Sequence, residues 1–414
     1  MTAKKLIHNL HLWLGLASGL VVFIVGLTGC LYVFIAEIES VTAPYKRVPV
    51  RQDSYLAPTA LRTIAAAVFP GKRVRYINYQ QGRAAYIALF DKGYNVGVYT
   101  DPYTGARLHV KNEDSFDFFS FVLHGHRGLW MPYPIGRPVV DTAILIFIIL
   151  LLSGLVLWWP KNLRKANRLK SFTIKWKASP KRVNYDLHNV LGFYGMLILL
   201  VIAITGSLYG FEWVRSSFYK VTSGGKNYPA FRAPQSDTLV AGSFHSSSLD
   251  SLFESIHTKN PGAAFFVFFP DKKPDPIQVT INHQPGKTYD IELLYFDQFT
   301  LRKLPGPGIY KEKFQDATLA DRISRLNYDI HTGQIGGLPT KVLAFFASLI
   351  AASLPITGFY IWWGRSKWGR RRKDRRKGKQ QKDQQGNEPK NYNQQNTSNN
   401  ENIAIRPRPN PSGV

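Results

Sequence analysis

The sequence has little cysteine and few acidic residues. Cys30 is the single cysteine among 414 residues, which excludes a disulfide framework and a thiolate metal cluster built within the chain. Glycine-rich dinucleotide-binding and phosphate-binding patterns are also absent from any strand-to-helix context, which argues against a flavin or nicotinamide domain. Acidic residues number 27 against 53 lysines and arginines, so the net charge is +26 and its distribution needs an explanation.

Charge is almost missing from four apolar stretches of about 20 residues each, the length that a helix needs to cross the hydrocarbon core of a bilayer. These stretches are roughly residues 12–34, 139–159, 190–211 and 338–363. They exclude an ordinary soluble enzyme. The fold class that we predict is therefore membrane α-helical, a four-helix transmembrane bundle.

The positive charge follows the alternation of these stretches. Segments 1–11, 161–187 and 364–414 carry +2, +8 and +10, whereas the two long segments 37–138 and 215–337 carry only +5 and +2. Loops rich in lysine and arginine stay in the cytoplasm, so both termini are predicted to be cytoplasmic in a multi-pass membrane protein. The same distribution favours membrane lipid as the partner of the basic segments and argues against nucleic acid.

The chain matches itself at two fixed offsets, which predicts two copies of one unit. An offset of 204 residues places Gly154 on Gly358, Trp158 on Trp362 and Trp159 on Trp363. An offset of 177 residues gives six identities: His11 and His188, Gly15 and Gly192, Thr28 and Thr205, Gly29 and Gly206, Tyr32 and Tyr209, Phe34 and Phe211. Each unit is expected to run helix, outside domain, helix, with Thr-Gly or Ser-Gly pairs allowing helices or a flat cofactor to approach the backbone closely.

The two long segments outside the membrane share a second pattern. In the first, residues 57–69 have helical periodicity and the runs 73–80, 84–90 and 94–100 alternate like strands. In the second, a helix is expected near 248–258, with strands near 263–269, 276–282 and 289–296. The pattern predicts two small α+β domains, each a helix packed on an antiparallel sheet.

These expectations divide the chain into eight segments that alternate between the cytoplasm, the membrane and the periplasm. They are a cytoplasmic N-terminus with transmembrane helix 1 (1–36), a first periplasmic domain (37–123), transmembrane helix 2 with its periplasmic lead-in (124–160), a basic cytoplasmic loop (161–187), transmembrane helix 3 (188–214), a second periplasmic domain (215–330), transmembrane helix 4 (331–364) and a disordered basic cytoplasmic tail (365–414).

Histidines near the ends of the apolar stretches are the candidate cofactor ligands. His11 and His188 stand at the cytoplasmic ends of the first and third stretches, each four residues before a glycine. His331 precedes the fourth stretch on the periplasmic side, and His124 and His126 precede the second. Ionisable residues in a membrane bundle are costly unless they pair or bind something. Two imidazoles from separate helices can hold a haem iron between them, although a histidine at an interface can also be a simple polar cap.

The predicted ligand pairs are thus His11 with His188 on the cytoplasmic side and His124 with His331 on the periplasmic side, with His126 as the alternate to His124. His124 is preferred because Phe118, Phe121 and Val122 lead into it on a helical period. The sequence contains no Cys-x-x-Cys-His, so any haem would be held non-covalently. We assign no catalytic side chain.

The order of these patterns resembles the PepSY-associated transmembrane family, which includes iron-regulated inner-membrane proteins and ferrisiderophore reductases. The likeness covers roughly residues 4–368. It is carried by His11-Leu12-Trp13-Leu14-Gly15 with Leu27-Thr28-Gly29, Leu152-Ser153-Gly154 through Trp158-Trp159-Pro160, Asp186-Leu187-His188, His331-Thr332-Gly333, and Leu354-Pro355-Ile356-Thr357-Gly358. Asp101-Pro102-Tyr103-Thr104-Gly105 is similar to the closing turn of a PepSY domain, whereas the second copy, Asp297-Gln298-Phe299-Thr300-Leu301, has lost the proline and glycine.

The resemblance implies a four-helix bundle that holds two b-type haems and two PepSY-like periplasmic domains. It also implies an oxidoreductase that takes electrons from a cytoplasmic donor, which the sequence does not identify, and reduces a periplasmic Fe(III)-siderophore or another ferric complex. The alternative is a non-redox PepSY sensor or assembly factor that binds a peptide, a protease or another periplasmic protein. In that alternative the histidines would only cap helices.

Overall fold

The computed structural model describes residues 2–90, 93–159, 171–239 and 246–365. Residues 1–362 form one compact unit, and of the second unit, which begins at Trp363, the described part is the end of the last helix. The predicted basic loop is described from residue 171 onward, and the predicted basic tail lies outside the described residues after Arg365.

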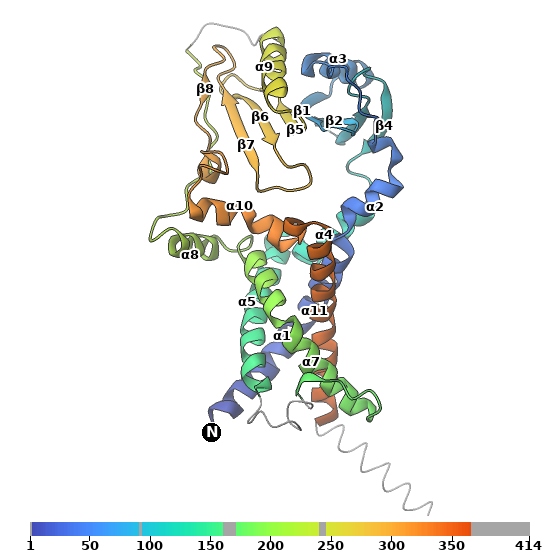
Figure 1. Cartoon of the computed structure of the whole chain (residues 1–414), viewed down its shortest axis with the longest axis vertical. Helices are drawn as coiled ribbons and strands as arrows, with labels where there is room; N and C mark the ends of the chain where they lie inside the picture. The colour runs from blue at the N-terminus through green and yellow to red at the C-terminus, as the bar shows by residue number, and fades with distance from the viewer. Residues whose placement is uncertain (1, 91–92, 160–170, 240–245, 366–414) are drawn as a thin grey trace, which may run out of the picture. The chain divides into compact units, whose positions relative to one another are not determined.

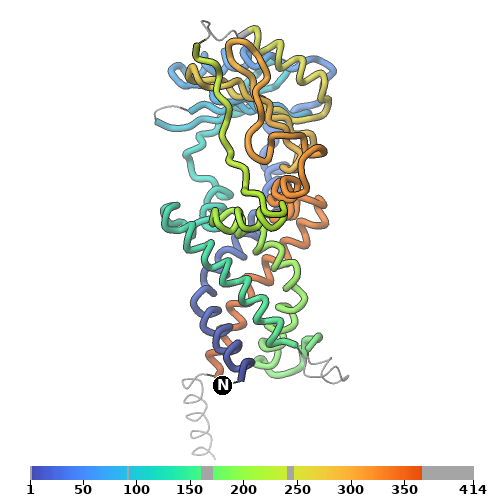
Figure 2. The backbone as a smooth tube through the Cα atoms, turned by 90° about the vertical axis from the view of Figure 1, so that its left-hand side faces the viewer, coloured from blue at the N-terminus to red at the C-terminus, as the bar shows by residue number. Residues whose placement is uncertain are grey.

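Four long helices confirm the four predicted membrane spans. Each is long and apolar enough to cross a bilayer, and they run beside one another in both views (Figures 1 and 2). They are α1 (Ala3–Tyr32), α5 (Tyr133–Trp158), α7 (Pro180–Ser207) and α11 (Leu338–Arg365). Each of the first three begins several residues before the apolar stretch that predicted it, because polar residues continue the helix beyond the hydrocarbon length.

All four helices contribute side chains to one buried core, which consists of Val22, Phe147, Leu151, Leu199, Ala203, Ala347 and Ala351. Small residues bring the helices close together. A Cβ atom at Gly26 would lie 2.9 Å from the backbone nitrogen of Ala352, so α1 and α11 meet without a side chain between their backbones. Close packing of this kind is how helices associate in lipid, where burial of apolar surface between helices gives little driving force.

Short helices follow or precede the long ones at one end of the bundle. After α1 and α7 come α2 (Ile35–Thr42) and α8 (Glu212–Thr222). Before α5 and α11 come α4 (Phe118–Gly128) and α10 (Leu319–His331), which start at side-chain caps from Asp117 and Thr318. We call this the α4–α10 end of the bundle. The end where α1 and α7 begin is called the opposite end.

A tight turn joins α4 to α5. Leu129 and Trp130 adopt left-handed backbone angles, with φ of 54° and 59°. The Trp130 indole nitrogen donates a hydrogen bond of 2.8 Å to the Phe121 carbonyl, and its ring packs over Gly125, where a Cβ atom would clash. These contacts fix the direction in which α4 enters the bundle, and α4 carries two of the candidate histidines.

The strands form one sheet of eight, with the order β4-β3-β2-β1-β5-β6-β7-β8. The strands are β1 (Arg73–Tyr79), β2 (Ala85–Phe90), β3 (Val96–Thr100), β4 (Arg107–Asn112), β5 (Ala264–Phe268), β6 (Ile277–Asn282), β7 (Ile291–Phe296) and β8 (Lys303–Leu304). The expected strands are all present, but β4 and β8 were not predicted. The expectation of two separate sheets was wrong, because β1 pairs antiparallel with β5 and joins the halves. This pairing covers two edges that would otherwise be open.

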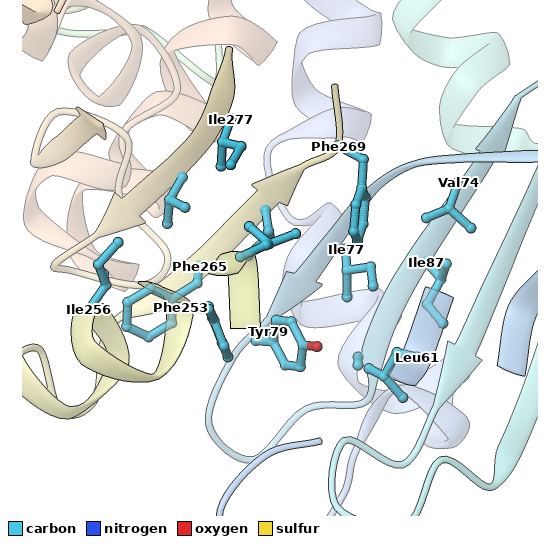
Figure 3. Close-up of a cluster of buried hydrophobic side chains, with 14 of the residues drawn as sticks. Leu61, Val74, Ile77, Tyr79, Ile87, Phe253, Ile256, Phe265, Phe269 and Ile277 are labelled. Atoms are coloured by element: carbon cyan, nitrogen blue, oxygen red, sulfur yellow. The ribbon is translucent and has the colours of Figure 1, made fainter. Parts of the chain in front are cut away.

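Helices α3 (Pro58–Val68) and α9 (Ser246–Lys259) pack on one face of this sheet. Their buried side chains share a single core with both halves of the sheet, and Figure 3 shows residues such as Leu61, Ile77, Phe253 and Phe265 within it. The Asp250 side chain of α9 accepts a hydrogen bond of 3.1 Å from the Thr59 backbone nitrogen of α3. The two halves therefore share one hydrophobic core.

The same turn closes β3 and β7, although its residues differ. Asp101 and Asp297 each accept hydrogen bonds from the backbone nitrogens two and three residues later. The fifth residue is Gly105 in one turn and Leu301 in the other, and both have positive φ, 74° and 57°. The second turn thus keeps its shape without glycine, so the loss of the glycine changed the strain in the turn and not its fold.

Hydrogen bonds connect helix α10 to the second half of the sheet. The buried Asp329 carboxylate accepts hydrogen bonds from the Thr288 backbone nitrogen at 2.9 Å and from its hydroxyl at 3.1 Å. The buried Arg325 guanidinium donates to the carbonyls of Tyr289 and Ile291. The shorter elements η1 (Pro44–Lys46), η2 (Gly308–Tyr310) and η3 (Gln334–Gly336) complete the described helices and strands.

Candidate functional site

Two imidazoles face each other at the α4–α10 end. His126 comes from the last turn of α4 and His331 is the last residue of α10. Their ring centroids are 6.3 Å apart and the ring planes make an angle of 54°. The two rings come from separate halves of the chain, so the arrangement depends on tertiary packing and not on local spacing.

Helix α1 fixes the orientation of the His126 ring. The His126 Nδ1 atom lies 3.0 Å from the Val25 carbonyl oxygen and 3.3 Å from the Thr28 hydroxyl. A carbonyl oxygen only accepts hydrogen bonds, so Nδ1 must carry the proton in this contact. The neutral ring then has its lone pair on Nε2, the nitrogen that is free to bind a metal.

Helix α7 holds His331 in the same way. Its Nδ1 atom lies 3.0 Å from the Ile202 carbonyl oxygen and 3.2 Å from the Thr205 hydroxyl. The Thr205 hydroxyl donates its own proton to the Val201 carbonyl at 2.8 Å, so it too acts as an acceptor toward the ring. Both imidazoles at this end therefore present Nε2 as an unprotonated nitrogen.

At the opposite end, His11 contacts α5. Its Nδ1 atom lies 2.8 Å from the Ser153 hydroxyl. That hydroxyl donates its proton to the Leu150 carbonyl at 3.2 Å, so it accepts a hydrogen bond from the His11 ring. Nε2 of His11 is again left with the lone pair.

His188 repeats this contact on α11. Its Nδ1 atom lies 2.9 Å from the Thr357 hydroxyl, which donates to the carbonyls of Ser353 and Leu354 at 3.0 Å each. Both histidines belong to helices that begin at this end, and their rings contact α5 and α11. The structure thus has a histidine pair at each end.

Each of the four rings also lies against a glycine. A Cβ atom added to the glycine would approach the Cε1 atom of the neighbouring histidine to between 3.0 and 3.4 Å. The pairs are Gly29 with His126, Gly206 with His331, Gly154 with His11 and Gly358 with His188. Every glycine directly follows the serine or threonine that bonds the same ring, so one hydroxyl-glycine dipeptide positions each imidazole.

Burial, supported by nearby positive charge, favours the neutral form of the two imidazoles at the α4–α10 end. Burial, with a smaller contribution from the neighbouring His331, lowers the pKa of His126 to about 4. Burial also lowers the pKa of His331, and the guanidinium of Arg137 on α5 acts in the same direction on both rings. Neutral imidazole is the form that coordinates metals, so these rings are in the binding form near pH 7.

The arrangement fits an iron porphyrin. Two metal–imidazole bonds of about 2 Å, together with the distance from each ring centre to its coordinating nitrogen, place the two ring centres about 6 Å apart. The centroids of His126 and His331 have this spacing. Within the described part of the chain, no group of three or more histidine, cysteine, aspartate or glutamate side chains is placed to hold a metal ion. Paired imidazoles suit an iron whose other ligands come from a porphyrin.

The model of the PepSY-associated TM region matches residues 8–365 of the chain. The chain belongs to the PepSY-associated transmembrane family. A search of the curated proteins gives no significant match. The matched residues include all four helices and all four histidines that lie on hydroxyl-glycine dipeptides, so the family region and the candidate site coincide.

Three of the four histidines predicted from the sequence lie at the candidate sites in the structure, and a different histidine takes the place of the fourth. His11, His188 and His331 lie in the paired sites, but His126 and not His124 faces His331. The preference for His124 assumed that Phe118 and Phe121 face the interior, whereas both are exposed, as is His124. The inward face of α4 instead carries Val122, Gly125 and His126, and the i, i+4 spacing of Val122 and His126 is the signal that could have identified it.

Two features of the site were not predicted. The sequence indicated that Thr28-Gly29 and its three counterparts allow close packing, but not that their hydroxyls orient the histidines. It also did not indicate the ion pair between Arg137 and Asp141, whose Nε and Oδ2 atoms are 3.0 Å apart beside this site. Arg127, which follows His126 in the sequence, is exposed and lies over the Tyr133 ring.

Proposed function

We propose that this membrane protein is a di-haem b electron-transfer protein that reduces a ferric complex, of the Fe(III)-siderophore class, for iron acquisition. The observation that carries the proposal is the opposed pair of His126 and His331, with both Nδ1 atoms occupied and both Nε2 atoms free. His11 and His188 would hold a second haem at the opposite end. Haem supplies a one-electron redox centre whose potential depends on its ligands and its surroundings.

The chain's own residues have three tasks in this proposal. The hydroxyl-glycine dipeptides fix the tautomer and the position of each imidazole before any ligand binds, which lowers the cost of binding. The apolar bundle core between the two histidine pairs excludes water. The eight-stranded sheet supplies the surface outside the bundle at which an acceptor would be held.

The direction of transfer rests on the charge of the loops. The segments with +8 and +10 flank the opposite end, so we place that end in the cytoplasm and the α4–α10 end and the sheet in the periplasm of the inner membrane. A cytoplasmic donor would then give one electron, and one Fe(III) would become Fe(II). The hard oxygen ligands typical of siderophores bind Fe(II) more weakly, so reduction releases the iron.

We also propose that the chain consists of two copies of one unit. Thr28 and Thr205 contact histidines of α4 and α10, and Ser153 and Thr357 contact histidines of α1 and α7. Members of the first pair are separated by 177 residues and members of the second by 204, which are the offsets of the sequence matches. Each helix therefore provides a hydroxyl-glycine dipeptide for a histidine that another element carries.

The test is the visible spectrum of the purified protein. We expect split haem bands after reduction with dithionite and two haems per chain. His331→Ala and His188→Ala should each lose about one haem, because each removes one ligand of a different pair. His124→Ala is the matched control: it changes a histidine of the same helix as His126 that is exposed, and it should keep both haems.

Protein that folds but binds no haem would overturn the proposal and leave the non-redox sensor or assembly factor as the explanation for the family domains. Loss of haem in His124→Ala with full haem in His126→Ala would overturn the assignment of the pair. Reduction of a ferric siderophore by dithionite-reduced protein, followed as reoxidation of the haem bands, tests the substrate class separately.

A further inference from the structure

A buried ion pair lies next to the histidine pair at the α4–α10 end. Arg137 is in the first turns of α5 and its guanidinium Nε lies 3.0 Å from Oδ2 of Asp141, one turn further along the helix. Both side chains are largely buried, and Asp141 is 4% exposed. Removing two charges from water is expensive and such a pair adds little net stability, so its position needs another reason.

The pair lies between the two elements that carry or seat the imidazoles. On one side, Gly128 of α4, two residues after His126, packs against the backbone of Gly136 and Arg137. On the other side, the Asp141 carboxylate lies against Gly210, where a Cβ atom would clash, four residues after the glycine that seats His331. The charge of Arg137 acts on both imidazole rings.

We infer that Arg137 raises the reduction potential of a redox centre bound by His126 and His331, and that Asp141 holds Arg137 in place and limits the size of this effect. This inference rests on the proposed function. A fixed positive charge stabilises the reduced state, which has one more electron, and the low dielectric of a buried site strengthens the interaction. The centre at the α4–α10 end would thereby attract electrons from the centre at the opposite end.

The matching position in the second half of the chain provides a control. Lys341 lies 204 residues after Arg137, at the start of α11, and is also buried. Its Nζ atom lies 2.8 Å from Oε1 of Glu37 on α2. The partner of Lys341 is therefore a carboxylate of another helix, whereas the partner of Arg137 lies on the same helix. Arg127 is next to His126 in sequence and its charge also acts on that ring, but its side chain is exposed, so water weakens the interaction.

The experiment is a redox titration of the full-length protein, followed in the haem bands and fitted to two midpoint potentials. Arg137→Gln should lower one midpoint by about 59 mV or more, which is a tenfold fall in the ratio of reduced to oxidised centre at a fixed potential. Asp141→Asn should raise the same midpoint, because Arg137 then lacks its counter-charge. Lys341→Gln should leave both midpoints near the wild-type values.

Opposite shifts in the two single variants are the signature of a charge effect, because loss of structure would move both in the same direction. Breaking a buried pair can unfold a protein, so two further variants are measured. The double variant Arg137→Gln/Asp141→Asn removes both charges, and Arg137→Lys keeps the positive charge. Unshifted midpoints with two haems bound would overturn this inference alone. Absence of haem from the wild type would instead overturn the proposed function, and with it this inference.

Discussion

The glycines that seat the four imidazoles allow a graded test of the site. Replacing each with alanine adds one methyl group at a known distance from the Cε1 atom of a histidine. That distance is 3.0 Å at Gly206, 3.2 Å at Gly358 and 3.4 Å at both Gly29 and Gly154. Contact at 3.4 Å is close to ordinary packing, whereas at 3.0 Å the ring of His331 must move by a few tenths of an ångström.

Two opposing free-energy changes decide the outcome. All four glycines lie within helices, so alanine should stabilise each helix by up to about 1 kcal/mol. Forcing extra volume into a packed interior costs about 1–3 kcal/mol. At Gly29 the gain should dominate or the two should cancel, and at Gly206 the cost should dominate. We expect Gly206→Ala to be less stable than Gly29→Ala by about 1–3 kcal/mol, with Gly358→Ala between them.

The assay is thermal unfolding of the four variants in the same detergent, together with their haem content. Gly29→Ala serves as the matched control for Gly206→Ala, because both glycines lie near the end of a helix and follow a threonine that bonds a histidine at the same end of the bundle. If Gly206→Ala proved as stable as Gly29→Ala, the histidine rings would not be seated as tightly as the structure places them.

Two predictions concern the sheet and its junction with the bundle. Asp329→Ala should destabilise the protein by about 3 kcal/mol, because it leaves the Thr288 backbone nitrogen without the carboxylate that accepts from it, and hydrogen exchange at the Thr288 amide should accelerate. For Asp297, burial favours a higher pKa, but hydrogen bonds from the backbone nitrogens of Asp237, Thr300 and Phe299 outweigh it and lower the pKa. Its contribution to stability is therefore full above about pH 4 and is lost as the pH falls through the lowered pKa. Unfolding measured from pH 6 to pH 2 should lose less stability in Asp297→Asn than in the wild type, and equal losses would contradict this reasoning.

The features of the fold that depend on local periodicity could be predicted from the sequence. The four apolar stretches became α1, α5, α7 and α11 because their length is that of a bilayer-spanning helix. The alternating runs became strands because hydrophobic residues repeat with the period of a strand. The pairing of β1 with β5 could not be predicted, since it joins strands nearly 190 residues apart and the pattern of one strand does not identify its partner. Strand β4 was missed because only two apolar residues, Leu108 and Val110, alternate with its polar residues, and both are exposed.

At the candidate site, the end of the bundle at which each histidine lies could be predicted, but not the direction of its ring. The choice between His124 and His126 depends on which face of α4 meets α1, and Phe118 and Phe121 suggested the wrong face because large aromatic residues can remain exposed where a helix lies outside the bundle core. Arg137 was missed for a similar reason. In the sequence it is one arginine before an apolar stretch, and its partner Asp141 is one residue among many.

The hydroxyl-glycine dipeptides link helix packing to the chemistry of the site. A threonine or serine in a helix donates its proton to a carbonyl of the preceding turn, so its oxygen is free to accept one further bond, and here that bond comes from an imidazole N–H. The glycine that follows has no Cβ atom, so the ring can lie directly against the helix backbone. Loss of the hydroxyl would remove the acceptor that fixes the tautomer of the ring, and a Cβ atom at the tightest of these glycines, Gly206, would displace the ring. The same two residues therefore let a histidine of another element approach the helix and engage its Nδ1 atom, which leaves the lone pair on Nε2, and the dipeptide is present on all four long helices.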